Sequence, residues 1–99
     1  MLESVYEAAL VVELTERRIP FVRQAHTELK YKGQAIGEGR LDLLVDEVLV
    51  VELKSVEALM PVHVAQVLSY LRASGCRLGL LINFNVNVLK NGVKRVVLT

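Results

Sequence analysis

Three ionisable residues interrupt apolar, strand-forming segments of this 99-residue chain. Asp42 lies within "RLDLLV", and Glu52 and Lys54 lie within "VLVVELK". A charged side chain in a buried strand is costly unless it is paired with an opposite charge or binds a metal ion. Because Mg²⁺ is often held by one or two carboxylates together with water and a substrate phosphate, these residues are the first candidates for chemistry.

The loop between the two segments decides whether the carboxylates meet. The segments predict a hairpin around Asp46 and Glu47. With a two-residue loop Asp42 pairs with Val51, and Glu52 then points away from Asp42. One additional loop residue or a bulge places Asp42 beside Glu52, because side chains alternate along a strand. The sequence leaves both registers open. We favour the second, in which a single cation offsets two carboxylates that otherwise repel one another.

Several helices and strands must position this hairpin. Gly and Pro are absent from the first expected helix, whose apolar residues recur on several faces and predict cover on more than one side. Pro61 and Gly75 are typical of the start and end of the second helix. The expected elements are a helix over 2–18, a strand over 21–31, a Gly-rich turn region over 32–39, strands over 40–45 and 48–54, a helix over 61–74, a strand over 77–83 and an edge strand over 93–98.

Composition limits the functional classes. The length fits one domain, residues 1–99. An apolar fraction of 53% is high for a small monomer and predicts self-association as a homodimer, and a net charge of +1 excludes a globally basic nucleic-acid-binding surface. Cys76 is the only cysteine, which fits a reducing compartment. The sequence shows neither a membrane span nor a secretion signal, so we expect a cytoplasmic protein without membrane contact.

The chain resembles the PD-(D/E)XK nuclease superfamily, and within it the small GxxExxY proteins. The resemblance is carried by "LESVYEAAL", "RLDLLV", "VVELKSV" and "AQVLSYLRASGCRLGLLINF". It implies an α/β, restriction-endonuclease-like α-β-β-β-α-β core, in which helices flank a mixed central sheet. The opening Gly of the family motif would fall one place before Met1. We therefore expect the domain to lack a helical segment that usually lies upstream.

The resemblance also implies roles for the charged strand residues. Asp42, Glu52 and the backbone carbonyl of Leu53 would hold Mg²⁺ or Mn²⁺, which polarises the scissile phosphate and lowers the pKa of a bound water. Lys54 would steady or help to deprotonate that water and offset charge on the transition state. The alternative is a structural ion pair between Lys54 and Glu52.

Two further motifs enter through the resemblance. Glu3 matches the acid of the family's first-helix motif, with Tyr6 as its Tyr, and Glu7 lies one turn further on the same face as a substitute. The alternative for both acids is a solvated position that favours the helix dipole. Gln66 and Tyr70 match the QxxxY motif of RecB-like nucleases, whose Gln lies beside the metal and whose Tyr positions substrate. The alternative is a core Tyr with a hydrogen-bonded hydroxyl.

These residues predict a metal-dependent nuclease that hydrolyses phosphodiester bonds in DNA or RNA. The aromatic content of 5% offers no evident stacking platform for bases, so we expect a dimer to complete any groove that binds nucleic acid. The alternative function is a catalytically silent nuclease fold that serves as a binding or regulatory module through protein or nucleic-acid contacts. In a third interpretation, Asp42, Glu52 and Lys54 are only a structural charge network.

Overall fold

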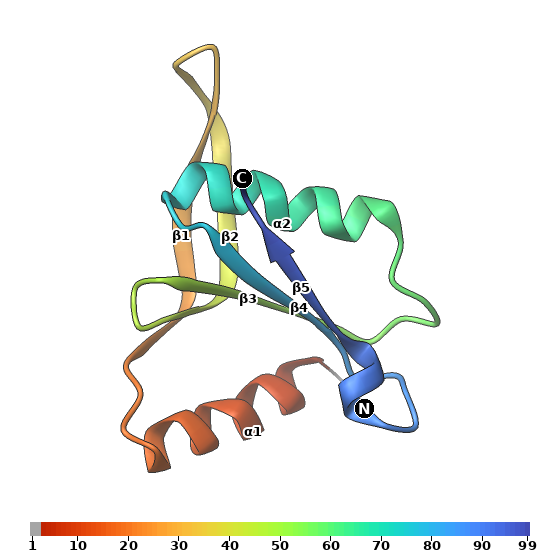
Figure 1. The fold of residues 1–99 in the computed structure, drawn as a ribbon. Coiled ribbons are helices and arrows are strands. Elements are labelled where there is room, and N and C mark those ends of the chain that lie inside the picture. The colour runs from red at the N-terminus through yellow and green to blue at the C-terminus, as the bar shows by residue number, and fades with distance from the viewer. Residues whose placement is uncertain (1–2) are drawn as a thin grey trace.

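The structure, a computed structural model, describes residues 3–99 and contains two α-helices and a five-stranded sheet (Figure 1). Leu2, at which the first helix was expected to begin, lies outside the described residues. The elements are α1 (Glu3–Glu16), β1 (Phe21–Tyr31), β2 (Gln34–Val45), β3 (Leu49–Lys54), α2 (Pro61–Ser74), β4 (Leu78–Asn83), the short 3₁₀ helix η1 (Leu89–Gly92) and β5 (Val93–Val97).

The strands lie in the order β1-β2-β3-β4-β5. The β1–β2, β2–β3 and β4–β5 pairs are antiparallel, and the β3–β4 pair is parallel because α2 provides the crossover between them. The sheet is therefore mixed, and the α-β-β-β-α-β order expected for a restriction-endonuclease-like core is confirmed. Strand β5 is an edge strand, as predicted.

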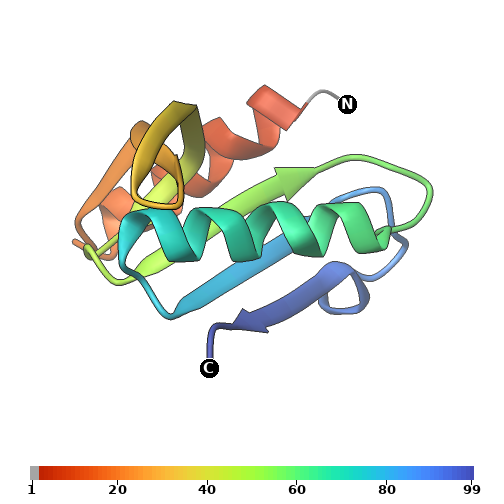
Figure 2. The same cartoon turned by 90° about the horizontal axis from the view of Figure 1, so that it is seen from above.

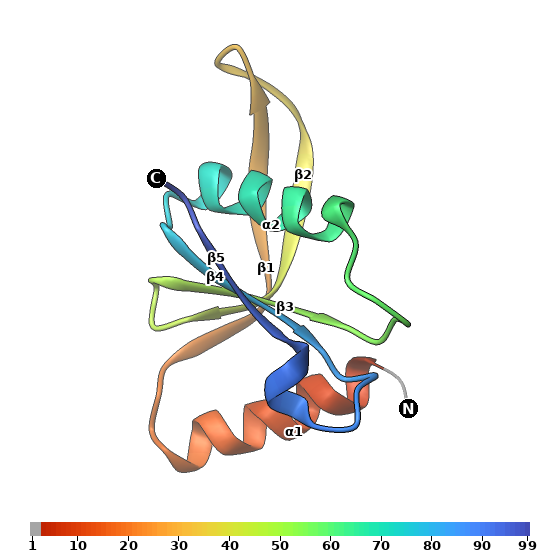
Figure 3. The same ribbon diagram turned by 45° about the vertical axis from the view of Figure 1, so that its right-hand side comes forward.

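The two helices cover opposite faces of the sheet (Figures 2 and 3). The apolar residues of α2 pack with Leu41, Val50 and Leu81, whereas Leu14 of α1 packs with Leu43, Val45, Val51 and Leu53. The strands β2 and β3 therefore lie in the middle of the molecule, with an apolar cluster on either face.

Helix α1 is covered on one side only. Glu7 and Leu14 are its buried residues, whereas Val5 and Val12 are 48% and 54% exposed. The expectation that this helix is covered on more than one side is wrong for the described residues, because its covered side chains lie along one face, against the sheet and against Phe84, which follows β4 (Figure 3).

The prediction of a turn region over residues 32–39 is also wrong. Only Lys32 and Gly33 form the turn, with φ of 51° and 79°, and β2 begins at Gln34. A tight two-residue turn with positive φ matches the twist of a hairpin, so the ladder continues through Gly37 and Gly39, which pair with Leu29 and Thr27. The local glycine content predicted a loop, but pairing with the long strand β1 holds these glycines in an extended conformation. The hairpin of β1 and β2 projects beyond the rest of the sheet (Figure 1).

Helix α2 has the bounds that its sequence predicted. Pro61 occupies its first turn, His63 Nδ1 accepts a hydrogen bond of 2.8 Å from the Met60 N–H, and Gly75 ends the helix with φ of 79°. His63 is thus a capping residue. Neither α-helix in residues 3–99 combines the length and apolar character that crossing a membrane requires.

Candidate functional site

The central feature of the site is the point at which β2 and β3 separate. The two strands pair from Val45–Leu49 to Leu43–Val51, and the loop between them spans residues 46–48. This loop is one residue longer than the shortest alternative, and Asp46 and Glu47 make the turn with φ of 52° and 61°. The register favoured from sequence is therefore confirmed, and Asp42 and Glu52 form the next facing pair beyond the ladder.

Side-chain hydrogen bonds replace the ladder at this separation. The Leu53 N–H donates to Asp42 Oδ2 at 2.8 Å, and the Asp42 N–H donates to Glu52 Oε1 at 3.4 Å. Each carboxylate thus contacts the backbone of the opposite strand. These contacts fix both carboxyl groups beside one another and beside the backbone of Leu53.

Glu52 is only 3% exposed. Burial, followed by the hydrogen bond and the negative charge of Asp42, raises the pKa of Glu52 to about 9, and the nearby Lys54 acts in the opposite direction. Without a cation, the pair therefore retains a proton at neutral pH. Two adjacent carboxylates that cannot both ionise alone are a donor set that fits a divalent cation, since the ion supplies the missing positive charge.

A cavity of about 190 Å³ lies between α1 and this part of the sheet, and it is lined by Glu3, Ser4, Glu7, Gln24, Asp42 and Leu53. Glu3 is exposed and accepts a hydrogen bond of 3.2 Å from the Ser55 N–H. Glu7 is 7% exposed. The structure therefore brings Glu3, Asp42 and Leu53 to one cavity, and it adds Glu7 as the more deeply buried acid.

Glu7 is held by two residues of β1. Arg23 Nη2 lies 3.0 Å from Glu7 Oε2, and Gln24 Nε2 donates to Glu7 Oε1 at 2.6 Å. Sequence reasoning missed Arg23 and Gln24. Polar residues are ordinary on an exposed edge strand, so nothing in the sequence indicates that these two contact Glu7 of α1. Within residues 3–99, no three His, Cys, Asp or Glu side chains converge closely enough to hold a metal ion by themselves.

Gln66 and Tyr70 are joined to one another rather than to the carboxylates. Gln66 Nε2 donates to the Tyr70 hydroxyl at 3.2 Å, and both residues are half-buried on α2. The ring of Tyr70 packs against Gly39 of β2. In the described chain, no hydrogen bond links this pair to Asp42, Glu52 or Lys54.

The segment that follows β3 is held by Asn83, a third residue that sequence reasoning missed. The Val56 N–H donates to Asn83 Oδ1 at 3.1 Å, Asn83 Nδ2 donates to the Val56 carbonyl at 2.9 Å, and the Phe84 N–H donates to the Lys54 carbonyl at 2.9 Å. Asn83 is the buried last residue of the apolar strand β4, and an amide at the end of an apolar run was the signal that could have identified it. These bonds fix the backbone beside Lys54.

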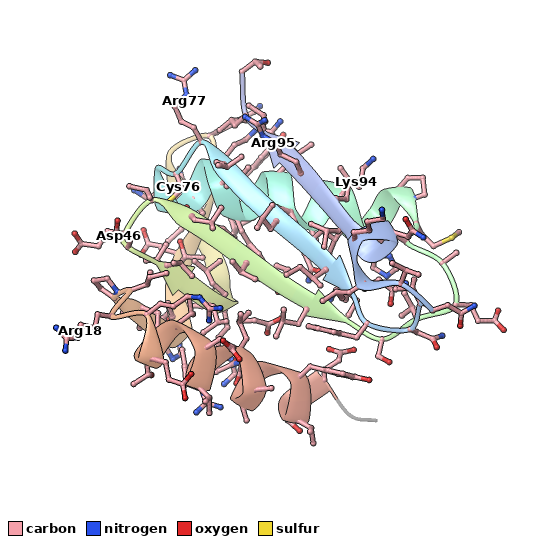
Figure 4. The ribbon with its side chains drawn as sticks, turned by 60° about the horizontal axis from the view of Figure 1, so that its bottom comes forward. Arg18, Asp46, Cys76, Arg77, Lys94 and Arg95 are labelled. Atoms are coloured by element: carbon pink, nitrogen blue, oxygen red, sulfur yellow. The ribbon has the colours of Figure 1, made fainter. Side chains whose placement is uncertain are left out.

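Two basic residues near the C-terminus lie at the edge of the sheet. Figure 4 shows Lys94 and Arg95 on the edge strand β5, and it shows Asp46 on the loop between β2 and β3. Both basic residues are exposed. They charge the free edge of the sheet, which disfavours pairing with another strand.

Comparison with known proteins agrees with this architecture. The sequence profile of the PD-(D/E)XK nuclease superfamily matches residues 1–96. The crystal structure of SSO0001 is similar to this fold with a TM-score of 0.71 at 17% sequence identity, over 95% of this chain and 48% of that one. The chain thus spans about half the length of that protein. No curated protein matches the sequence.

Proposed function

The chain belongs to the PD-(D/E)XK nuclease superfamily, and we propose on that premise that it is a metal-dependent nuclease acting on phosphodiester bonds in DNA or RNA. The observation that carries the proposal is the pair of carboxyl groups at the separation of β2 and β3, where Asp42 and Glu52 each contact the opposite strand. This geometry supports a cation site more directly than a structural charge network, because a second carboxylate beside a buried Glu52 is destabilising unless a proton or a cation compensates it.

In this proposal Asp42, Glu52 and the Leu53 carbonyl hold Mg²⁺ or Mn²⁺, and waters and a phosphate oxygen complete the coordination. The bound ion would polarise the phosphate and lower the pKa of a water. Lys54 lies two residues from Glu52, on the same face of β3. Its ammonium would steady the attacking water and offset charge that develops on the phosphate.

The candidate residues of the two helices would act around the proposed cation site. We assign the acid of α1 to Glu7 as well as Glu3, because both line the cavity with Asp42 and Leu53. Gln66 and Tyr70 would contact substrate only after their mutual hydrogen bond opens. Within the superfamily, "ESVYEAAL" supports placement among the GxxExxY proteins.

The proposal extends to the whole chain. Residues 1–99 would form one nuclease-like domain that acts in the cytoplasm, where Cys76 stays reduced. A homodimer would supply the nucleic-acid surface that a chain of net charge +1 lacks.

One observation favours a second candidate, a catalytically silent binding or regulatory module. Within residues 3–99, the structure has no cluster of three metal-ligating side chains, so the site depends on backbone, water and substrate oxygens for its other ligands. A site with so few protein ligands would lose turnover easily while retaining the fold.

A cleavage assay tests the proposal. Wild-type protein is incubated with supercoiled plasmid, single-stranded DNA or RNA, and with Mg²⁺, Mn²⁺ or a chelator. We expect metal-dependent cleavage that falls at least about 100-fold in Glu52→Gln and Lys54→Ala, as expected when a group acting in the transition state is removed. Glu13→Gln, which alters an exposed acid of α1, is the matched control. If folded wild-type protein leaves all three substrates uncut with both metals, the nuclease assignment is wrong and the silent module replaces it.

A further inference from the structure

Gln24 has an unusual backbone conformation in β1, a strand whose ladder with β2 also shifts register between Leu29 and Lys30. Its φ is 50°, and the ladder between β1 and β2 pairs Arg23 with Leu43 and Ala25 with Leu41 but omits the position between them. In that register the residue opposite Gln24 is Asp42. Left-handed conformations of residues other than Gly cost energy and are concentrated at functional sites.

The conformation has a consequence for α1. Gln24 lines the same cavity as Asp42, and its amide donates the 2.6 Å hydrogen bond to Glu7 Oε1. Arg23 contacts the other carboxylate oxygen of Glu7. The two oxygens of Glu7 are therefore held by two consecutive residues of β1, which restricts the rotation of the carboxylate within the cavity.

We propose that Gln24 is a positioning residue of the cation site, and that its left-handed backbone places the amide where it orients Glu7 toward the cavity shared with Asp42. This inference rests on the proposed function, because it requires that a cation binds beside Asp42. Partners that orient ligands around a metal site contribute substantially to its affinity. Gln24 would therefore strengthen cation binding without contacting the ion.

Substitution by Gly separates the side chain from the backbone. Gln24→Gly removes the amide, yet Gly adopts positive φ freely, so the strand conformation is retained. Lys32→Gly is the matched control, because Lys32 has a nearly identical φ of 51° but lies in the hairpin turn and does not line the cavity. Melting curves of both variants report whether each remains folded.

The measurement is the dissociation constant of Mn²⁺, obtained from the electron paramagnetic resonance signal of the free ion. We expect Gln24→Gly to raise the Kd about tenfold, and Lys32→Gly to leave it unchanged. Glu7→Gln should raise the Kd to a similar extent. If Gln24 acts through Glu7, the double variant will bind no more weakly than Glu7→Gln alone, since the removed partner leaves nothing to position.

The outcomes distinguish the inference from the function on which it rests. If wild-type protein binds Mn²⁺ and Glu52→Gln abolishes binding, but Gln24→Gly binds like wild type, the positioning role is refuted and the cation site stands. Effects of Gln24→Gly and Glu7→Gln that multiply in the double variant also refute the role. If folded wild-type protein binds no Mn²⁺ at millimolar concentrations, the cation site and the positioning role are both wrong.

Discussion

At the scale of single residues, the main feature is the pairing of two carboxyl groups in a place with little solvent. Asp42 and Glu52 are adjacent because β2 and β3 stop pairing at Leu43 and Val51. Their backbone contacts satisfy part of their hydrogen-bonding capacity, but the charge remains uncompensated when both are ionised. Glu52 therefore favours its protonated form in the metal-free protein.

A pH dependence of stability follows from Glu52. Its pKa is raised from the usual 4.5 to about 9 by burial and by Asp42, so between these values the folded chain binds more protons than the unfolded chain. The free energy of unfolding must then fall as pH rises from about 5 to 9, with a slope of at most about 1.4 kcal/mol per pH unit from this group. Glu52→Gln cannot ionise, so it should flatten this slope and become more stable than wild type near pH 9.

Urea unfolding in the presence of a chelator, at several pH values, measures this effect. Glu13→Gln, at an exposed position on α1, should retain the slope of the wild-type protein. Parallel pH curves for wild type and Glu52→Gln would show that Glu52 is ionised alike in the folded and unfolded chain.

At the scale of elements, close contacts of small residues set the distance between helix α2 and the sheet. A Cβ added at Gly39 would lie 2.6 Å from Tyr70 Cε1, and one added at Gly79 would lie 2.7 Å from Val67 Cγ1. The helix therefore rests on two glycines, one in β2 and one in β4. Gly39 places Tyr70 against β2, three residues before Asp42.

Gly39→Ala tests this contact. We expect the added methyl group to displace the Tyr70 ring and to destabilise the fold on the order of 1–3 kcal/mol, as overpacking does. Gly37→Ala is the control in the same strand, because a Cβ there meets nothing within 4 Å and φ is not positive. Denaturant unfolding measures both variants, and equal stabilities would mean that α2 moves away from the sheet without cost.

At the scale of the whole molecule, the surface retains many apolar side chains. Large hydrophobic residues are exposed on α1, on β1 and β2, in the loop between β2 and β3, around the start of α2, at and just before η1, and on β5: Val5, Val12, Val22, Tyr31, Ile36, Val48, Met60, Val62, Val88, Leu89, Val93 and Val97. Apolar residues scattered singly are normal on a protein surface. We propose that those which lie close together on the surface are buried against a second copy of the chain.

Sedimentation velocity tests the proposed homodimer. Between about 1 and 100 µM, the range in which interfaces of modest affinity fill, we expect the weight-average mass to rise toward twice that of one chain. The rise should persist at high salt, because apolar contacts rather than charges would hold the two copies together. A mass equal to one chain at every concentration would exclude the dimer.

Much of the fold could be predicted from the sequence, because its signals are local. Pro61 and Gly75 bracket α2 at the observed bounds, and alternation and apolar runs locate the strands. The glycines at 37 and 39 led to the wrong prediction of a turn, because pairing with β1, a separate segment of the chain, holds them in an extended conformation. Asp42, Glu52 and Lys54 stood out as charges within apolar strands, which is a local signal as well.

The order of residues specifies which charges enter the buried strands, whereas the packing of the folded chain specifies which of those charges meet. The three-residue loop at 46–48 set the register that pairs Asp42 with Glu52. Packing of α1 on the sheet brought Glu7 to Gln24 and Arg23, whereas Gln66 and Tyr70 bonded to one another on the opposite face. These contacts join residues from separate elements, and their formation depends on the packing of the whole chain rather than on local preference.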